Sequence, residues 1–224
     1  MNAASMTVMP ILATPLGVAT IPDAEPLNRE LSALFAQRAA ADAAAADAAA
    51  GNPLRYVGRD DLFEWPDAPV RRLAQNMIGA LYSLVGNTSD LGETQMRALR
   101  LEARAWFTLI RANGALPAAN FPMTAWCAIY CVAAPTAAET RADSGTLRLY
   151  ESRLSTTFQD ASTAALRIPY SASHYSWRPV AGQLVIFPAS LTHEVALLRA
   201  SEELILVTAR LRFVGVGQEG YSRW

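Results

Sequence analysis

The chain has 224 residues, of which 52% are hydrophobic and 17% are charged, and its formal net charge at pH 7 is −1. This length suits one domain with a sizeable core. A near-neutral charge gives no electrostatic footprint for nucleic acid, and no apolar run reaches the ~20 residues that cross a membrane. We therefore expect neither a nucleic-acid partner nor a membrane span.

The two cysteines, Cys127 and Cys131, lie four residues apart in a segment that reads as a strand. On a strand this spacing is roughly 13 Å, which is too far for a disulfide. Residues 1–22 are apolar but lack the basic start of a signal peptide. Free thiols and a cytoplasmic location are therefore expected.

The first part of the chain predicts a strand pair over residues 10–21, followed by a helix. Asn28 is a candidate N-cap, and the helix would run into the alanine-rich segment 39–50, because alanine is the best helix former. Gly51 and Pro53 would end it.

A second helix is predicted to begin after Asp67, which can cap it, with Pro69 tolerated in the first turn. Apolar residues then recur at helical spacing and are expected to face the core: Leu73, Met77, Leu81 and Leu84. A short helix is expected after Ser89.

From residue 99 the period changes to two, and residues 99–109 alternate between apolar and polar side chains, which predicts a strand. Further strand-like runs follow at 126–132, 146–150, 165–169, 175–178, 183–187, 194–199 and 203–214. Short strands separated by Pro or Gly favour a mainly β protein, a double-sheet jelly roll whose outer face is covered by two or three N-terminal helices. The expected organisation is one domain over 1–224, with a strand and helical layer at 1–98, a β core at 99–214 and a tail at 215–224.

Several blocks carry a family resemblance. They are Asp61–Pro66, the Gly-x-Leu strand Gly145–Tyr150, and the segment Pro179–Pro188 that leads to His193. The chain resembles the bacterial and phage branch of the 2-oxoglutarate- and Fe(II)-dependent oxygenases. The resemblance implies a double-stranded β-helix, which is a cupin-like jelly roll, together with Fe(II) and 2-oxoglutarate as cofactors. It also implies hydroxylation of a small molecule or a protein side chain.

The resemblance also assigns positions for the iron ligands. His193 matches the distal ligand, whereas the two proximal positions hold Ala119 and Phe121, neither of which can bind iron. The family places an arginine that binds 2-oxoglutarate about eleven residues after the distal histidine, and that position here is Leu204. Because Phe121 stands in place of a metal ligand, it is expected to act as an apolar plug.

Other residues could replace the missing donors. His174 could join His193, with Asp143 or Asp160 as the carboxylate, although a surface histidine is the favoured interpretation. Three further residues are candidates for co-substrate binding: Tyr130, which stands at a family tyrosine, Arg199 and Arg210. The alternatives are a core position for the tyrosine and solvated positions for the arginines.

Two hypotheses of function remain open. The first is a divergent dioxygenase with His193 as one iron ligand. The second is a pseudoenzyme without iron or 2-oxoglutarate, in which the barrel binds a small-molecule or peptide ligand or another protein. A homodimer is expected by analogy with other cupin-like barrels.

Overall fold

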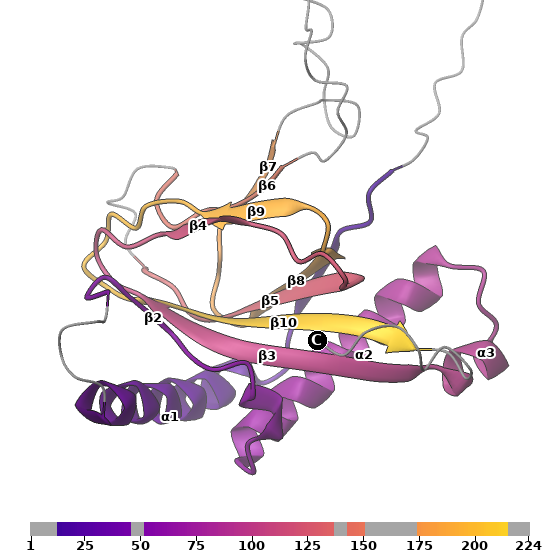
Figure 1. Cartoon of the computed structure of the whole chain (residues 1–224), viewed down its shortest axis with the longest axis horizontal. Coiled ribbons are helices and arrows are strands. Elements are labelled where there is room, and N and C mark those ends of the chain that lie inside the picture. Colours follow the sequence, from indigo (N-terminus) through magenta and orange to yellow (C-terminus); the bar gives the residue numbers. More distant parts are fainter. Residues whose placement is uncertain (1–12, 46–51, 137–142, 151–173, 215–224) are drawn as a thin grey trace, which may run out of the picture.

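The computed structural model describes residues 13–45, 52–136, 143–150 and 174–214. It consists of two antiparallel sheets stacked face to face, with helices on the outer face of the larger sheet (Figure 1). The predicted jelly roll with N-terminal helices is thereby confirmed.

The helices are α1 (Ala24–Ala45), α2 (Ala68–Thr88) and α3 (Glu93–Ala98), with a short 3₁₀ helix η1 (Leu62–Glu64). The strands are β1 (Gly17–Thr20), β2 (Arg55–Val57), β3 (Arg100–Ile110), β4 (Leu116–Ala119), β5 (Trp126–Ala133), β6 (Leu147–Tyr150), β7 (His174–Trp177), β8 (Gln183–Pro188), β9 (Thr192–Val195) and β10 (Leu204–Val214).

The major sheet has the strand order β1-β8-β5-β10-β3-β2, and the minor sheet has the order β4-β9-β6-β7. The long strands β3 and β10 pair without interruption from Leu204 opposite Ile110 to Val214 opposite Arg100. They extend beyond the minor sheet (Figure 1). We call the end of the barrel core where Trp106 and Arg210 lie the barrel mouth.

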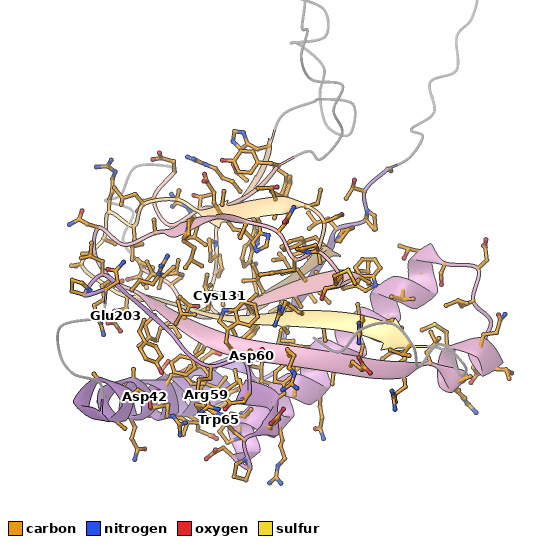
Figure 2. All side chains as sticks on the ribbon, in the orientation of Figure 1. Asp42, Arg59, Asp60, Trp65, Cys131 and Glu203 are labelled. Carbon is orange, nitrogen blue, oxygen red and sulfur yellow. The ribbon has the colours of Figure 1, made fainter. Side chains whose placement is uncertain are left out.

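Side chains alternate across the major sheet and fill two separate cores. On β5, Cys127, Ile129 and Cys131 lie between the two sheets, whereas Ala128 and Tyr130 pack towards the helices. We call these the barrel core and the helix-side core. Figure 2 shows Cys131 between the sheets, and Trp65 and Asp42 on the helix side.

The helix-side core is built by α1 and α2 against the major sheet. The predicted repeat on α2 is confirmed for Leu73, Met77 and Leu81, which are fully buried there, whereas Leu84 is only partly buried and Val85 takes the next core position. The predicted start of α1 at Asn28 is wrong: the helix begins at Ala24, so Asn28 lies inside it and is buried.

The expected strand pair over 10–21 is one described strand, β1, which pairs with β8. The strand expected at 194–199 begins and ends earlier, as β9, because the chain turns away after Val195 and the Leu198 N–H donates to the carbonyl of Gly114. The short strands β2 and β4 were not predicted, and the strand expected at 165–169 lies outside the described residues. Among the described helices, none combines the length and apolar character needed to cross a membrane.

Candidate functional site

His193 lies on β9 with its ring pointing into the barrel core, and only 8% of the residue is exposed. Its Nδ1 is 3.2 Å from the carbonyl oxygen of Leu191. A carbonyl can only accept a hydrogen bond, so this contact assigns the ring proton to Nδ1 and the lone pair to Nε2. Burial lowers the pKa of His193, which keeps the imidazole neutral.

The two positions predicted to hold the other iron ligands lie beside this ring. Ala119 on β4 stands directly opposite His193 on β9. Phe121, two residues further along, packs edge-on against the imidazole with ring centroids 5.2 Å apart. The predicted register is therefore confirmed, and it places a methyl group and a phenyl ring next to the retained histidine.

A row of rings packed edge to face runs from the barrel core to the mouth through these residues. Phe187 packs against His193 on one side with centroids 5.2 Å apart, and Phe121 packs against Trp106 at 5.5 Å. The guanidinium of Arg210 lies over both Trp106 and Phe121, at 5.5 and 5.7 Å from the ring centres. Phe121 thus occupies the space between His193 and the mouth, as expected of an apolar plug.

The residues present here do not fit Fe(II). A non-haem iron site of this kind needs two imidazoles and one carboxylate on one face of the metal. In the described part of the chain, no three His, Cys, Asp or Glu side chains are grouped closely enough to hold a metal ion. Cys127 and Cys131 also face the barrel core, but both are free thiols whose pKa is raised by burial, that of Cys131 to about 12.

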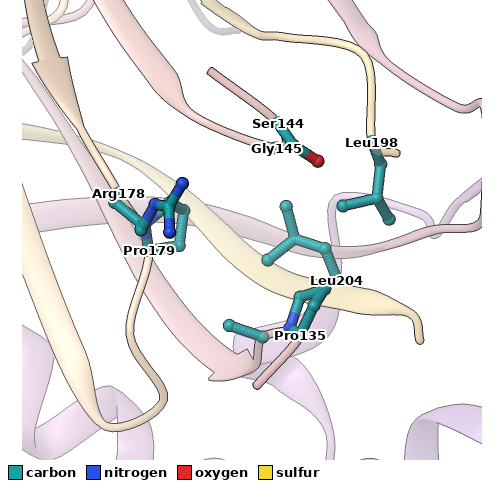
Figure 3. A pocket seen from close by; sticks show the side chains of 8 residues that line it. Pro135, Ser144, Gly145, Arg178, Pro179, Leu198 and Leu204 are labelled. Atoms are coloured by element: carbon teal, nitrogen blue, oxygen red, sulfur yellow. The ribbon is translucent and has the colours of Figure 1, made fainter. Parts of the chain in front are cut away.

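The position of the missing arginine is also apolar. Leu204, at the start of β10, is 1% exposed and faces the barrel core. It lines a cavity of about 30 Å³, roughly the volume of one water molecule, together with Gly145, Ser144 and Arg178 (Figure 3). Arg178, which follows β7, was not singled out from the sequence, because nothing in the local pattern brings it near Leu204.

Of the two alternatives for Tyr130, the core position is the one that the structure has, and the pocket-facing one is wrong. Its side chain points into the helix-side core, where the hydroxyl donates a 2.7 Å hydrogen bond to Oδ1 of Asn28 on α1. Burial raises the pKa of Tyr130 to about 12. This side chain is therefore separated from His193 by the major sheet.

The candidate arginines lie at different places. Arg199 is exposed in the connection between β9 and β10, where its backbone N–H donates to the hydroxyl of Ser144. Arg210 is on the barrel side of β10 at the mouth, and its Nη2 donates to Asp60 at 3.1 Å. Of the three predicted co-substrate residues, only Arg210 shares a side of the sheet with His193.

His174 is not brought to His193. It lies on the outer face of the minor sheet, in register with Tyr150, and its ring packs 5.8 Å from that tyrosine. The proposed carboxylate partner Asp143 forms an ion pair with Arg148 at 3.6 Å, and Asp160 lies outside the described residues. The rearranged metal site considered for His174 and Asp143 is therefore wrong.

Comparison with known proteins shows what this chain is similar to. A family model described as "Putative 2OG-Fe(II) oxygenase" matches residues 104–208. A comparison with curated proteins gives no match.

Solved structures share the fold at low sequence identity. A Pseudomonas putida prolyl-4-hydroxylase is 18% identical with a TM-score of 0.56, covering 90% of this chain and 94% of that one. HygX from Streptomyces hygroscopicus, with nickel and 2-oxoglutarate bound, is 11% identical with a TM-score of 0.59, covering 95% and 86%. A Trichoplax adhaerens prolyl hydroxylase in complex with a peptide fragment is 9% identical with a TM-score of 0.55, covering 94% and 88%.

At these identities the structural likeness shows the fold, and the family model adds the match in sequence across most of the β core. The chain therefore has the fold of the 2-oxoglutarate- and Fe(II)-dependent oxygenases, and its residues 104–208 match the model of a putative family of them.

Proposed function

We propose that this chain is a catalytically inactive member of its family, in which the barrel is kept as a ligand-binding or protein-interaction module. The observation that supports this proposal is the pairing of Ala119 with His193, together with the packing of Phe121 on the imidazole ring. One neutral imidazole cannot hold Fe(II) against water, and the chain places no carboxylate at the second position.

The co-substrate side of the barrel supports the same proposal. A bidentate arginine is the usual partner for a carboxylate, and the corresponding position holds the buried Leu204. Leu206 and Ile129 fill the barrel core beside it. Hydrophobic side chains therefore take the place of the polar groups that would bind 2-oxoglutarate.

The mouth of the barrel is the surface that we propose receives a small-molecule or peptide ligand. Trp106 and Phe121 offer aromatic faces there, and the Arg210 side chain is 26% exposed above them. Such a surface suits a flat or acidic group, because arginine binds carboxylates and aromatic rings stack on planar groups. A cytoplasmic location is part of this proposal and is supported by two thiols that are free and buried.

A second candidate function is a divergent dioxygenase that hydroxylates a small molecule or a protein side chain. The observation that favours it is the hydrogen bond between Nδ1 of His193 and the carbonyl of Leu191. Metal-binding histidines commonly fix their tautomer in this way, which leaves Nε2 available as a ligand. In this alternative His193 contributes one ligand, and backbone or substrate groups supply the others.

Metal analysis of protein purified without oxygen distinguishes the two functions. The inactive form predicts the same low iron content in the wild type and in His193→Ala, and no decarboxylation of added 2-oxoglutarate. Stoichiometric iron in the wild type that is lost in His193→Ala, accompanied by 2-oxoglutarate turnover, would overturn the proposal in favour of the dioxygenase.

A further inference from the structure

An apolar groove of about 210 Å³ runs along one edge of the major sheet, where the edge strand β1 lies beside α2 (Figure 1, β1 in indigo). Its walls are the three residues Gly17–Ala19 on β1 and Ser83 and Leu84 on α2, and its floor is the neighbouring strand β8. We call this surface the β1–α2 face.

The groove exists because small residues stand where larger ones would close the helix-side core. A Cβ atom at Gly17 would lie only 3.2 Å from the Leu84 side chain, so glycine lets the helix approach the strand. Ala19, Ala80 and Ser83 are equally small and leave the edge of this layer open. Val18, at the centre of β1, is 54% exposed; it lies opposite the barrel-core residue Val185, so its side chain projects at the sheet edge from the side of the strand opposite to Gly17 and Ala19.

The β1–α2 face carries no charged side chain. Residues 13–22, which include β1, contain no Asp, Glu or Arg, and neither do residues 73–89, which include most of α2. In a chain with 17% charged residues, such a gap on two adjacent elements is unusual for a solvated surface. Depletion of charge is instead the compositional mark of the buried part of a protein interface.

Two of the other sheet edges in the described part of the chain are protected against pairing. β2 contains Arg55 and is followed by Arg59, and β4 contains Pro117 and a shift of register. Charges, prolines and bulges are the usual means of blocking contact between edges. β1 has none of these within its own span, and among the described strands none pairs with its outer backbone edge.

We infer that the β1–α2 face is the contact surface of a homodimer, in which β1 pairs antiparallel with β1 of a second copy. A two-fold axis brings a surface against itself, so like charges on it would meet each other, and an uncharged face avoids that repulsion. The same axis presents the two edge strands in antiparallel orientation and brings the open groove of each copy next to the other copy. This inference does not depend on the proposed function, because the β1–α2 face lies outside the barrel.

Substitutions that place a charge on this face test the inference. Sedimentation velocity of the full chain over a range of concentrations should show a dimer. Val18→Arg should raise the dimer dissociation constant at least about a hundredfold, since two unpaired charges then meet at the axis. Ser83→Arg should do the same from the helix side, and it improves helix propensity, so dissociation could not be attributed to an unfolded helix.

Val57→Arg is the matched control. Val57 is an exposed valine on β2, the opposite edge of the same sheet, and its 49% exposure is close to the 54% of Val18. This variant should remain dimeric. A wild-type protein that stays monomeric at the highest concentration would overturn the inference, as would a dimer that survives both Val18→Arg and Ser83→Arg or that is lost equally in Val57→Arg.

Discussion

Restoring the two missing donors should restore metal binding. The double variant Ala119→His/Phe121→Asp places an imidazole opposite His193 and a carboxylate where the phenyl ring now touches that histidine. The three side chains would then form the two-imidazole, one-carboxylate set that Fe(II) requires. We expect the double variant to bind one divalent ion per chain, whereas the wild type and each single variant bind weakly or not at all.

The contacts of Phe121 set the cost in stability. Its ring makes two aromatic pairs, with His193 and Trp106, and lies under the guanidinium of Arg210. With about 0.5–1.5 kcal/mol for each pair and about 0.5–1 kcal/mol for the cation–π contact, the metal-free double variant should lose about 1.5–4 kcal/mol. For a chain of this size, that lowers Tm by about 3–16 °C.

Metal should return a measurable part of this loss. Free metal at a hundred times its Kd stabilises the folded state by about 2.7 kcal/mol, which is about 5–11 °C in Tm. Thermal unfolding without oxygen, with and without Fe(II) or Ni²⁺, measures both effects in one sample. The reasoning assumes that the backbone still holds positions 119, 121 and 193 in a metal-binding arrangement. A double variant that is folded by circular dichroism but is not stabilised by either ion would refute it.

Three further outcomes are expected. Tyr130→Phe should lower the free energy of unfolding by about 1–3 kcal/mol in urea titrations, because Oδ1 of Asn28 loses its buried donor, and ligand binding at the barrel should stay unchanged. Burial lowers the pKa of His193 in the folded protein below its value in the unfolded chain, so the unfolded state binds more protons. The free energy of unfolding should therefore decline as the pH falls below about 6.5, by at most about 1.4 kcal/mol per pH unit. His193→Phe should remove this pH dependence, and a variant that keeps it would assign the slope to other groups. Cys127 and Cys131 should not react with a thiol reagent until the protein unfolds, because burial raises the pKa of both thiols. Rapid reaction of the native protein would show that the barrel core opens.

The sequence predicted the layout around His193 well, because that layout depends on spacing along single strands. The number of residues between Phe121 and β5 and between β8 and His193 fixes which positions face each other, and the pairing of Ala119 with His193 follows that register. The alternation over residues 99–109 was equally clear, because the observed strand β3 has eleven residues and is shifted by one position from the predicted range.

The direction of Tyr130 could not be predicted in the same way. Side chains on both faces of β5 are buried, because the helices cover the outer face as completely as the minor sheet covers the inner one. A strand buried on both sides has no polar side chains to mark its solvent face, so alternation separates two faces without identifying either. The favoured surface position of His174 agrees with the structure, whereas the alternative metal site fails because β6 lies between β7 and β9, a long-range arrangement that local spacing does not reveal.

In the described part of the chain, the helix-side core and the barrel core are separate clusters on the two faces of the major sheet. Substitutions inside the barrel therefore leave the packing of α1 and α2 on the sheet intact. The chain could lose iron-binding residues one at a time while the layer that includes Phe35, Leu73 and Met77 kept it folded. In such an architecture the side chains of the barrel core can change from catalytic to ligand-binding ones while the protein remains folded at every step.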